Sequence, residues 1–313
     1  MIATHSPYEI LAIIVLGKQL FTPVHIPVLV DPILGIAKEQ FSSDSKLEIL
    51  DCTLGEGGHS SFFLEQFPNA TILGVDQDLV MLSRAKERLN ISDRISYLHS
   101  NFANLDLDQK FDLAIVDLGI SNFHYVGAER GFSYKSVEPL DMRLNPQETE
   151  ITAEEILNVY PKKNLETIFY EYGEERWTKK IVERILETRK KRAITTTQDL
   201  AKLVESVIPR PFWPPHAHPS IRVFQALRIE VNDELEVLRK AIPKIFSFLK
   251  DRGILQIISF HSLEDRIVKH SFKSLENSLI LTKKPVMATD SEIQTNPQSR
   301  TAKLRAIQKR VDI

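Results

Sequence analysis

Cysteine is almost missing from this chain of 313 residues, because Cys52 is the single one. No intrachain disulfide and no metal centre built on several cysteines can therefore form, and the count fits a reducing cytoplasm. Long apolar runs are missing too. The run from Ile10 to Leu16 has seven residues, whereas a helix needs roughly 20 to cross a bilayer. No basic segment precedes it and no small-residue cleavage site follows, so we expect no signal peptide, no membrane partner and a cytoplasmic location.

A large net charge is missing as well. The 40 Lys and Arg residues face 42 Asp and Glu residues, which leaves a formal charge of −2. The overall charge therefore does not indicate a nucleic-acid partner, and any basic surface must be local. What the chain does have is a hydrophobic fraction of 42%, which predicts a packed core rather than disorder. Its length fits one large or two ordinary domains.

From Lys46 to about residue 125, short apolar runs alternate with helical patterns such as Leu79 to Leu89. The runs that we interpret as strands are Leu47–Leu50, Thr71–Val75, Arg94–Leu98 and Phe111–Val116. This strand–helix–strand rhythm predicts an α/β fold with a doubly wound parallel sheet.

The rhythm stops near Val126, and the sequence is helical and rich in loops from there to Ile221. One long helix is expected next, followed by a short helix broken at Gly253 and a strand from Ile254 to Ser259. The apolar face of the long helix is formed by Phe224, Leu227, Val231, Leu235, Leu238 and Ile242. We therefore expect an α/β domain made of residues 22–125 and 222–313, a helical insertion domain of residues 126–221, and an added extension at residues 1–21.

The stretch from Asp51 to Ser60 reads D-C-T-L-G-E-G-G-H-S and directly follows the first expected strand. Glycine is usually kept where φ is positive or where another group comes close to the backbone. Ligands of open parallel sheets bind at the carboxyl ends of the strands. The stretch is therefore either a tight structural turn or part of a binding site.

Acidic residues favour the binding site. Asp51, Asp76 and Asp117 end three of the expected strands, and Asp76 lies 21 residues after Gly55. That is close to the spacing of about 20 at which a carboxylate meets the ribose hydroxyls of a nucleotide cofactor.

A dinucleotide such as NAD fits this turn less well. The G-x-G-x-x-G register gives Gly55, Gly57 and then Ser60. Asp51 and Glu56 also bring negative charge to a turn that would have to hold a pyrophosphate. A sulfonium nucleoside such as S-adenosylmethionine (SAM) suits an acidic turn better.

Several longer stretches lie outside any generic cofactor-binding fold. In chain order they are H-I-P-V-L (25–29), D-L-G-I-S (117–121), A-E-R-G-F-S-Y (128–134), P-L-D-M-R (139–143), Y-G-E-E-R (172–176), F-Q-A-L-R-I-E-V-N (224–232) and S-F-H-S-L-E-D-R-I-V-K (259–269). From about residue 25 to residue 310, this set closely resembles the RsmH/MraW family of SAM-dependent 16S rRNA (cytosine-N4)-methyltransferases, in the family's order.

The resemblance implies a Rossmann-like SAM-dependent methyltransferase domain with a helical insertion domain. It implies transfer of a methyl group from SAM to the exocyclic N4 of a cytidine in the decoding region of 16S rRNA. The partner is then 16S rRNA in the small ribosomal subunit; we expect no metal, and a homodimer is possible. Two other interpretations stay open. One is an amino-methyltransferase acting on DNA or a small molecule, and the other is a non-catalytic ribosome-assembly factor that holds SAM as a structural ligand.

The family's cofactor contacts carry over to particular positions of this chain. They are Gly57, Gly58, His59, Asp76, Phe102, Asp117 and His124. His124 is a departure, because the family usually has glutamine at this position.

Methyl transfer to the N4 amine of cytosine needs hydrogen-bond acceptors, because the lone pair of this amine is delocalised into the ring. A site can hold the amine in line with the sulfonium methyl and accept its hydrogen bonds as the nitrogen pyramidalises. Asp117, Ser121 and Asn122 are suitable acceptors at the expected edge of the sheet. The widespread signature of amino-methyltransferases, an acid or asparagine before two prolines and an aromatic residue, is replaced here by Asp117-Leu-Gly-Ile.

Two polar features have a structural interpretation beside a functional one. Ser262 can cap a helix that carries Glu264 and Asp265 in its first turn, and His261 beside it can position a base. His216 and His218 lie two residues apart, but the segment has no nearby acid or cysteine. This favours a solvated loop over a metal pair.

The same holds for the features that suit RNA. The basic runs Arg189–Arg192 and Arg300–Arg310 are either solvated helix ends or phosphate contacts. Phe212 and Trp213 either stack on an unpaired base or pack the insertion onto the core.

Overall fold

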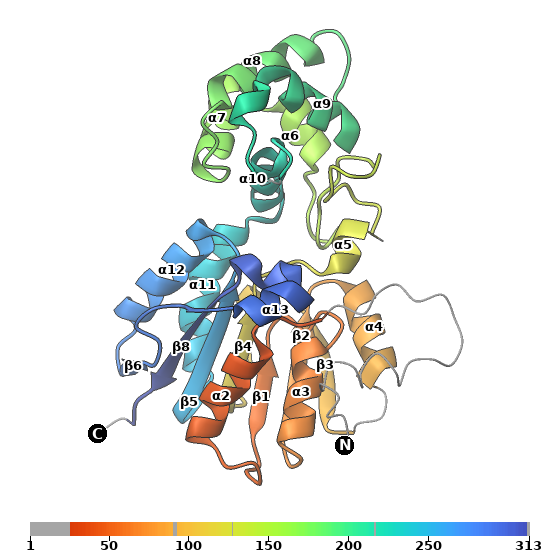
Figure 1. Cartoon of the computed structure of the whole chain (residues 1–313). Coiled ribbons are helices and arrows are strands. Elements are labelled where there is room, and N and C mark those ends of the chain that lie inside the picture. Colours follow the sequence, from red (N-terminus) through yellow and green to blue (C-terminus); the bar gives the residue numbers. More distant parts are fainter. Residues whose placement is uncertain (1–25, 90–92, 127, 216, 312–313) are drawn as a thin grey trace, which may run out of the picture.

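The structure is a computed structural model, and it describes residues 26–89, 93–126, 128–215 and 217–311. The expected extension at residues 1–21 lies outside the described residues. Figure 1 shows a sheet flanked by helices and, above one end of the sheet, a lobe made of helices. No helix in the described ranges is long and apolar enough to cross a membrane.

One sheet of eight strands forms the lower part of the molecule in Figure 1. Its order is β3-β2-β1-β4-β5-β8-β6, and β7 pairs with β8. The strands are β1 (Glu48–Asp51), β2 (Thr71–Asp76), β3 (Ile95–His99), β4 (Phe111–Asp117), β5 (Leu249–Ser259), β6 (Ser278–Ile280), β7 (Val286–Met287) and β8 (Lys303–Lys309). The first five strands pair in parallel, whereas β8 is antiparallel to β5, β6 and β7. The expected doubly wound α/β fold is confirmed.

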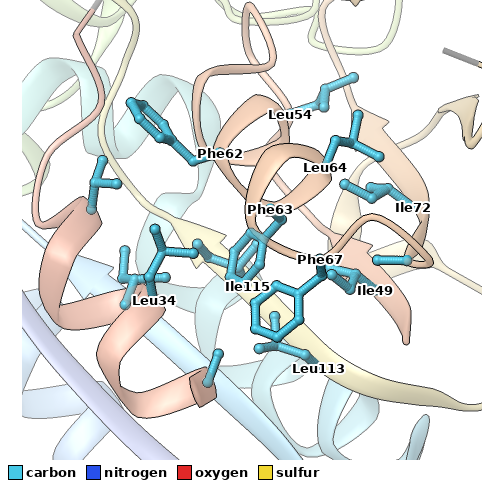
Figure 2. Packing of buried hydrophobic residues seen from close by; sticks show 14 of the residues in the cluster. Leu34, Ile49, Leu54, Phe62, Phe63, Leu64, Phe67, Ile72, Leu113 and Ile115 are labelled. Atoms are coloured by element: carbon cyan, nitrogen blue, oxygen red, sulfur yellow. The ribbon is translucent and has the colours of Figure 1, made fainter. Parts of the chain in front are cut away.

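Both faces of the sheet are buried under helices. Successive side chains of a strand point to opposite faces, so each inner strand contributes to both cores. Ile49 and Ile115 pack with the helices α2 (Val30–Gln40), α3 (Gly58–Gln66) and α4 (Leu79–Leu89). Figure 2 shows Phe63 of α3 and Phe67, the residue directly after α3, against these strands. Leu50 and Val116 face the other way, toward α11 (Glu234–Ser247) and α12 (Ser262–Ser274). This two-sided burial explains why the inner strands are almost wholly apolar.

The lobe has a hydrophobic core of its own, which contains buried residues from Phe132 to Val231. It is formed by α6 (Ala153–Val159), α7 (Lys162–Glu171), α8 (Thr178–Arg189), α9 (Thr197–Val207) and α10 (Ile221–Asn232). Shorter elements complete the fold: α5 (Asn122–Val126), α13 (Asp290–Thr295), and the 3-10 helices η1 (Phe102–Asn104), η2 (Arg210–Phe212) and η3 (Pro297–Thr301).

The prediction of one long helix through Phe224 and Ile242 is wrong. Asp233 adopts the left-handed conformation, with φ 49° and ψ 35°, and separates α10 from α11. The apolar stripe continues across this break, but the residues before and after Asp233 pack into different hydrophobic cores. Phe224 and Leu227 belong to the lobe, whereas Leu238 and Ile242 pack on the sheet.

The carboxyl-terminal part also differs from the sequence prediction. The strand expected from Ile254 begins five residues earlier as β5, with a register shift opposite Phe111 and Leu113 and without the expected short helix. The basic tail contains β8, in which Arg305 is 6% exposed and pairs with Asp265 at 2.6 Å. Arg305 is therefore part of the fold and is not available to a phosphate.

Candidate active site

The glycine turn joins β1 to α3, and its glycines have different reasons to be there. Gly55 (φ 54°) and Gly57 (φ 77°) both have left-handed backbones, which glycine adopts at little cost. A Cβ on Gly57 would lie 2.4 Å from Leu89, so packing also requires glycine there. A Cβ on Gly55 would meet only a carbonyl oxygen at 4.0 Å, so the space beside Gly55 is open to a ligand.

The carboxylate of Asp76 connects this turn to the end of β2. Its Oδ2 accepts a hydrogen bond from Gly55 N (2.8 Å) and its Oδ1 accepts one from Asp78 N (2.9 Å). Burial raises the pKa of Asp76, although these two hydrogen bonds act in the opposite direction. Each oxygen keeps a further lone pair with which it can accept a hydroxyl group.

Two cavities open at the carboxyl ends of the strands. The smaller has a volume of about 110 Å³ and is lined by Asp76, Phe102, Asp117 and His124 among others. The larger measures about 850 Å³ and extends to the lobe. Its lining includes the turn residues Gly58 and His59, whereas Gly57 lines neither cavity. The predicted cofactor contacts therefore divide between the two cavities.

The two cavities share one wall, which contains the end of β4 and the loop after it. The residues that line both are Thr53, Gly55, Asp117, Leu118, Gly119, Ile120, Ser121 and Glu264. The two cavities therefore adjoin at these residues, and ligands in the two cavities would come closest to each other beside them.

Two of the predicted amine acceptors belong to the shared wall. Asp117 Oδ1 accepts a hydrogen bond from Gly119 N at 3.2 Å, and Oδ2 lies 3.7 Å from His59 Nδ1. Ser121 Oγ accepts a hydrogen bond from Phe123 N at 3.2 Å. The side chain of the third, Asn122, lies outside what the structure describes.

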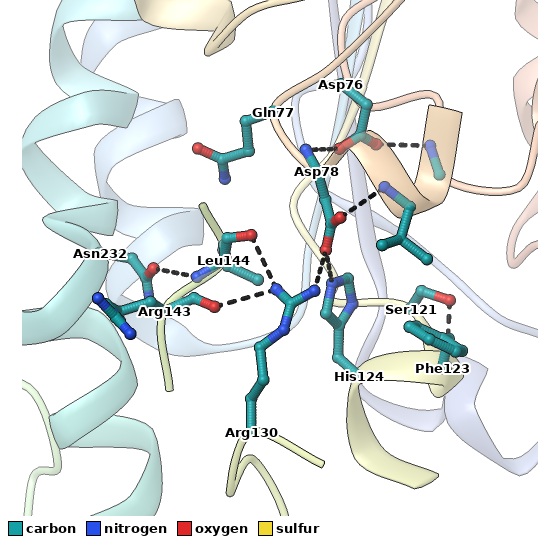
Figure 3. Close-up of polar contacts among 12 residues, drawn as sticks. Asp76, Gln77, Asp78, Ser121, Phe123, His124, Arg130, Arg143, Leu144 and Asn232 are labelled. Carbon is teal, nitrogen blue, oxygen red and sulfur yellow. Dashed lines mark hydrogen bonds and ion pairs between the residues drawn. The ribbon is translucent and has the colours of Figure 1, made fainter. Parts of the chain in front are cut away.

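His124 belongs to a polar network that reaches from the smaller cavity to the lobe (Figure 3). Its Nε2 lies 3.1 Å from Asp78 Oδ2, and Arg130 Nη2 approaches the same oxygen at 3.1 Å. Arg130 Nη1 also donates to the carbonyl oxygens of Arg143 and Leu144. Burial by itself raises the pKa of Asp78, but the hydrogen bond from His124 and the charge of Arg130 hold it below its ordinary value.

The Nδ1 atom of His124 has no hydrogen-bond partner among the described residues, although the side chain is buried. A buried polar atom without a partner is unfavourable. Because His124 also lines the smaller cavity, it stays a predicted cofactor contact.

Arg88 is a half-buried residue whose guanidinium feels the charge of Glu56. Both of its terminal nitrogens lack a hydrogen-bond partner within the described ranges, and burial lowers the pKa of its guanidinium. Arg88 lines the larger cavity. The sequence analysis did not single it out, because one arginine at the end of a helical pattern carries no signal.

His261 caps α12, and Ser262 does not. The His261 ring accepts a hydrogen bond from Glu264 N, and Glu264 Oε2 accepts one from His261 N. These two bonds form a capping box. His261 and Glu264 also line the larger cavity, so their structural role does not remove them from the site.

A possible group of metal ligands lies beside this cap, because Glu234, His261 and Glu264 each offer an atom within 4.8 Å of the others. The Arg228 guanidinium, however, takes both carboxylate oxygens of Glu234, at 2.8 and 3.0 Å. Glu264 already accepts two backbone hydrogen bonds. Arg228 therefore compensates the charge of Glu234, and the oxygens of both carboxylates are largely engaged, so we assign no metal to this group.

Several other residues singled out from the sequence have structural partners. Arg189 donates to the carbonyl oxygens of Leu157 and Tyr160, and Arg192 pairs with Asp199. Lys190 and Lys191 remain exposed.

Among the aromatic and histidine candidates in the proline-rich segment, some have structural partners and one is exposed. Trp213 packs with the lobe core and donates to Ile208 O, whereas Phe212 is 66% exposed. His218 stacks on Tyr134 and contacts Glu205, and His216 lies outside the described residues.

The strand order, the glycine turn after β1 and the acids that end β2 and β4 define a Rossmann-like SAM-dependent methyltransferase. A model of the MraW methylase family matches residues 22–310. The chain belongs to the MraW methylase family, which confirms the resemblance seen in the sequence motifs.

Relatives from spirochaetes match most of the chain. The ribosomal RNA small subunit methyltransferase H of Leptospira interrogans is 50% identical over 299 residues, which cover 92% of this chain and 89% of the relative. The protein of the same name from Leptospira biflexa is 44% identical and covers 91% of this chain and 95% of the relative. That of Borrelia hermsii is also 44% identical, and the coverage is 91% and 97%.

We expect Asp76→Ala to weaken SAM binding at least about tenfold while the fold survives, because it removes two charge-assisted hydrogen bonds to the ribose, each worth about 1.5–3 kcal/mol. The hydroxyls donate to the ionised carboxylate, whose pKa burial raises. Binding to the parent should therefore weaken as the pH falls through that raised pKa, and the variant should lose this dependence. Calorimetric titration at several pH values measures both effects. An unchanged affinity would remove Asp76 from the cofactor site.

The role of His124 can be tested with two substitutions. Glutamine can still donate to Asp78 and present a polar atom to the cavity, so His124→Gln should bind SAM about as well as the parent. His124→Leu, of similar size, should lose about tenfold in affinity. Equal affinities of the two variants in calorimetry would show that no polar contact from this position reaches the cofactor.

Proposed function

We propose that this enzyme transfers a methyl group from SAM to the exocyclic N4 of a cytidine in the decoding region of 16S rRNA. The observation that carries the proposal is the wall shared by the two cavities, which bears Asp117 and Ser121. A cofactor with its ribose in the smaller cavity and its remainder along Gly58 and His59 would meet a base in the larger cavity at these acceptors. The printed names of the relatives, ribosomal RNA small subunit methyltransferases, support RNA as the substrate.

The residues that line the smaller cavity fit SAM. Asp76 offers carboxylate lone pairs to the ribose, Phe102 offers an aromatic face, and His124 offers an unsatisfied ring nitrogen. Bound SAM supplies an electrophilic methyl group on a sulfonium sulfur. The chain itself orients the amine: Asp117 and Ser121 accept hydrogen bonds from N4 and stabilise the positive charge that develops on it. Asp117 is suited to this because it lines both cavities, and the proton that the methylated N4 releases can pass to its carboxylate or to solvent.

The larger cavity has features that suit a nucleic acid. The unpartnered guanidinium of Arg88 would meet a phosphate of the target strand. The helical lobe, expected to be the substrate-recognition domain, forms the far side of this cavity through Tyr134 and Phe224. The packing of α10 with α6 and α7 supports a lobe that ends near Asn232. A ribosomal substrate implies a cytoplasmic location. Light scattering, which measures the molar mass in solution, tests the possible homodimer.

The direct test is incubation of the protein with isolated 30S subunits and methyl-labelled SAM. We expect the label in 16S rRNA as N4-methylcytidine. A protein that binds SAM and 30S subunits but leaves the RNA unlabelled would be the non-catalytic assembly factor. Label on DNA or on a small molecule alone would instead support the other amino-methyltransferase interpretation.

The phosphate contact predicts a kinetic defect for Arg88→Gln. The apparent KM for 30S subunits should rise while SAM affinity stays the same, because the lost contact binds substrate without touching the cofactor. The difference from the parent should shrink as salt rises, since the parent's own phosphate contacts weaken. Steady-state methylation at two ionic strengths measures this, and an equal KM at low salt would contradict it.

The double variant Lys190→Ala, Lys191→Ala is the comparison for the surface run. It should show the same direction of change if these two lysines hold rRNA phosphates. Wild-type kinetics at every salt concentration would identify the run as a solvated helix end. Arg189 and Arg192 are left unchanged in this variant, because their hydrogen bonds and ion pair belong to the lobe.

A further inference from the structure

His261 is an unusual choice for the start of a helix. Ser, Thr, Asp and Asn are the favoured capping residues, because a short side chain with an oxygen is enough to accept the hydrogen bond. Here the Nδ1 atom of His261 does this work, at 3.4 Å from Glu264 N. An Nδ1 atom that accepts a hydrogen bond leaves the ring proton on Nε2. The cap itself has no use for this second nitrogen.

The Nε2 atom of His261 is buried and has no hydrogen-bond partner among the described residues. It lies 3.1 Å from Glu264 Oε1, outside hydrogen-bonding geometry, although His261 still lowers the pKa of the Glu264 carboxyl. A buried donor without a partner is rare in native proteins and calls for an explanation, of which an absent ligand is one. Capping accounts for the hydrogen bond at Nδ1, but it does not account for a buried Nε2 whose nearest acceptor is the carboxylate of Glu264.

Glu264 supplies an acceptor next to this donor. Its Oε2 accepts hydrogen bonds from Phe260 N (2.7 Å) and His261 N (3.2 Å), so Oε1 is the oxygen that remains. Glu264 lines both cavities, and His261 lines the larger one. The pair thus presents an N–H donor and a carboxylate acceptor side by side at the place where the cavities meet.

This pattern is the complement of one edge of cytosine. The N4 amine of cytosine is a donor, and N3 beside it is an acceptor. We propose that Glu264 Oε1 accepts a hydrogen bond from N4 while His261 Nε2–H donates one to N3, so that the pair reads the Watson–Crick edge of the target cytosine. This assignment rests on the proposed function. Glu264 then takes one of the two N4 hydrogens and leaves the other to Asp117 or Ser121, and His261 adds specificity through N3.

Uracil presents the reverse pattern, with O4 as an acceptor and N3–H as a donor. In the same pose, O4 would face the Glu264 carboxylate, and N3–H would face the Nε2–H donor of His261. Two unsatisfied contacts in a buried site reject a ligand far more strongly than a difference in shape does. The pair therefore selects cytidine before chemistry takes place.

Capping and base recognition can be separated with His261→Ser. Serine keeps an N-cap oxygen for Glu264 N but has nothing that extends to the position of Nε2. We expect the melting temperature and the SAM affinity of the parent, and a loss of at least about tenfold in kcat/KM for 30S subunits. Reconstituted 30S subunits with uridine at the target position serve as a competitive inhibitor. The ratio of their inhibition constant to the KM for normal 30S subunits should be lower for the variant than for the parent.

Two further variants keep the test decisive. Glu264→Gln retains a capping-box residue, but its amide can donate to O4, so it too should lose discrimination against the uridine competitor. Thr152→Ala removes the N-cap of α6, a capping box that lines neither cavity. It should lower the melting temperature and leave kcat/KM unchanged at a temperature where it is folded.

If His261→Ser and Glu264→Gln keep the parent's kcat/KM and its discrimination, the pair is only a helix cap and the inference is wrong. That result differs from failure of the proposed function, in which the parent protein itself would not label 30S subunits.

Discussion

The hydrogen bonds that Asp76 accepts from Gly55 and Asp78 hold the site together, because they fix the loops after β1 and β2 against each other. Two adjacent parallel strands deliver these loops to the same edge of the sheet. Together with the backbone bond from Leu54 N to Val75 O (2.8 Å), this tie fixes the turn at Gly55 beside the smaller cavity. Asp78 then extends the connection through His124 and Arg130 to the backbone of the lobe at Arg143 and Leu144.

The second organising feature is the loop after β4, which separates the two cavities. Asp117 ends β4, and its backbone N–H donates to Thr53 Oγ1 at 2.6 Å, which holds this loop against the turn after β1. Several single residues of this loop line both cavities, so the cavities adjoin there. A transfer reaction needs such an arrangement, because the reacting atoms of donor and acceptor must come into direct contact.

The sequence predicted the parallel strands well, since strands buried on both faces are short apolar runs, and the acids that end them are easily seen. It did not reveal the break at Asp233, because apolar spacing continues through a single left-handed residue. The sequence was also misleading at β8. Arg305 lies in a run of basic residues and looks exposed, but in the fold it pairs with Asp265, which is 40 positions earlier in the chain. The unpartnered atoms of Arg88, His124 and His261 depend on tertiary packing, which no local pattern encodes.

The central claim is that the methyl group passes directly from the cofactor to the base where the two cavities adjoin, beside Asp117 and Ser121. A crystal structure with S-adenosylhomocysteine and cytidine tests this most directly. The account predicts the ribose of the cofactor product on Asp76, its sulfur beside Asp117 and Ser121, and the cytosine in the larger cavity with N4 toward that sulfur. A cofactor product whose ribose lies away from Asp76, or a base on the far side of the lobe, would contradict the account.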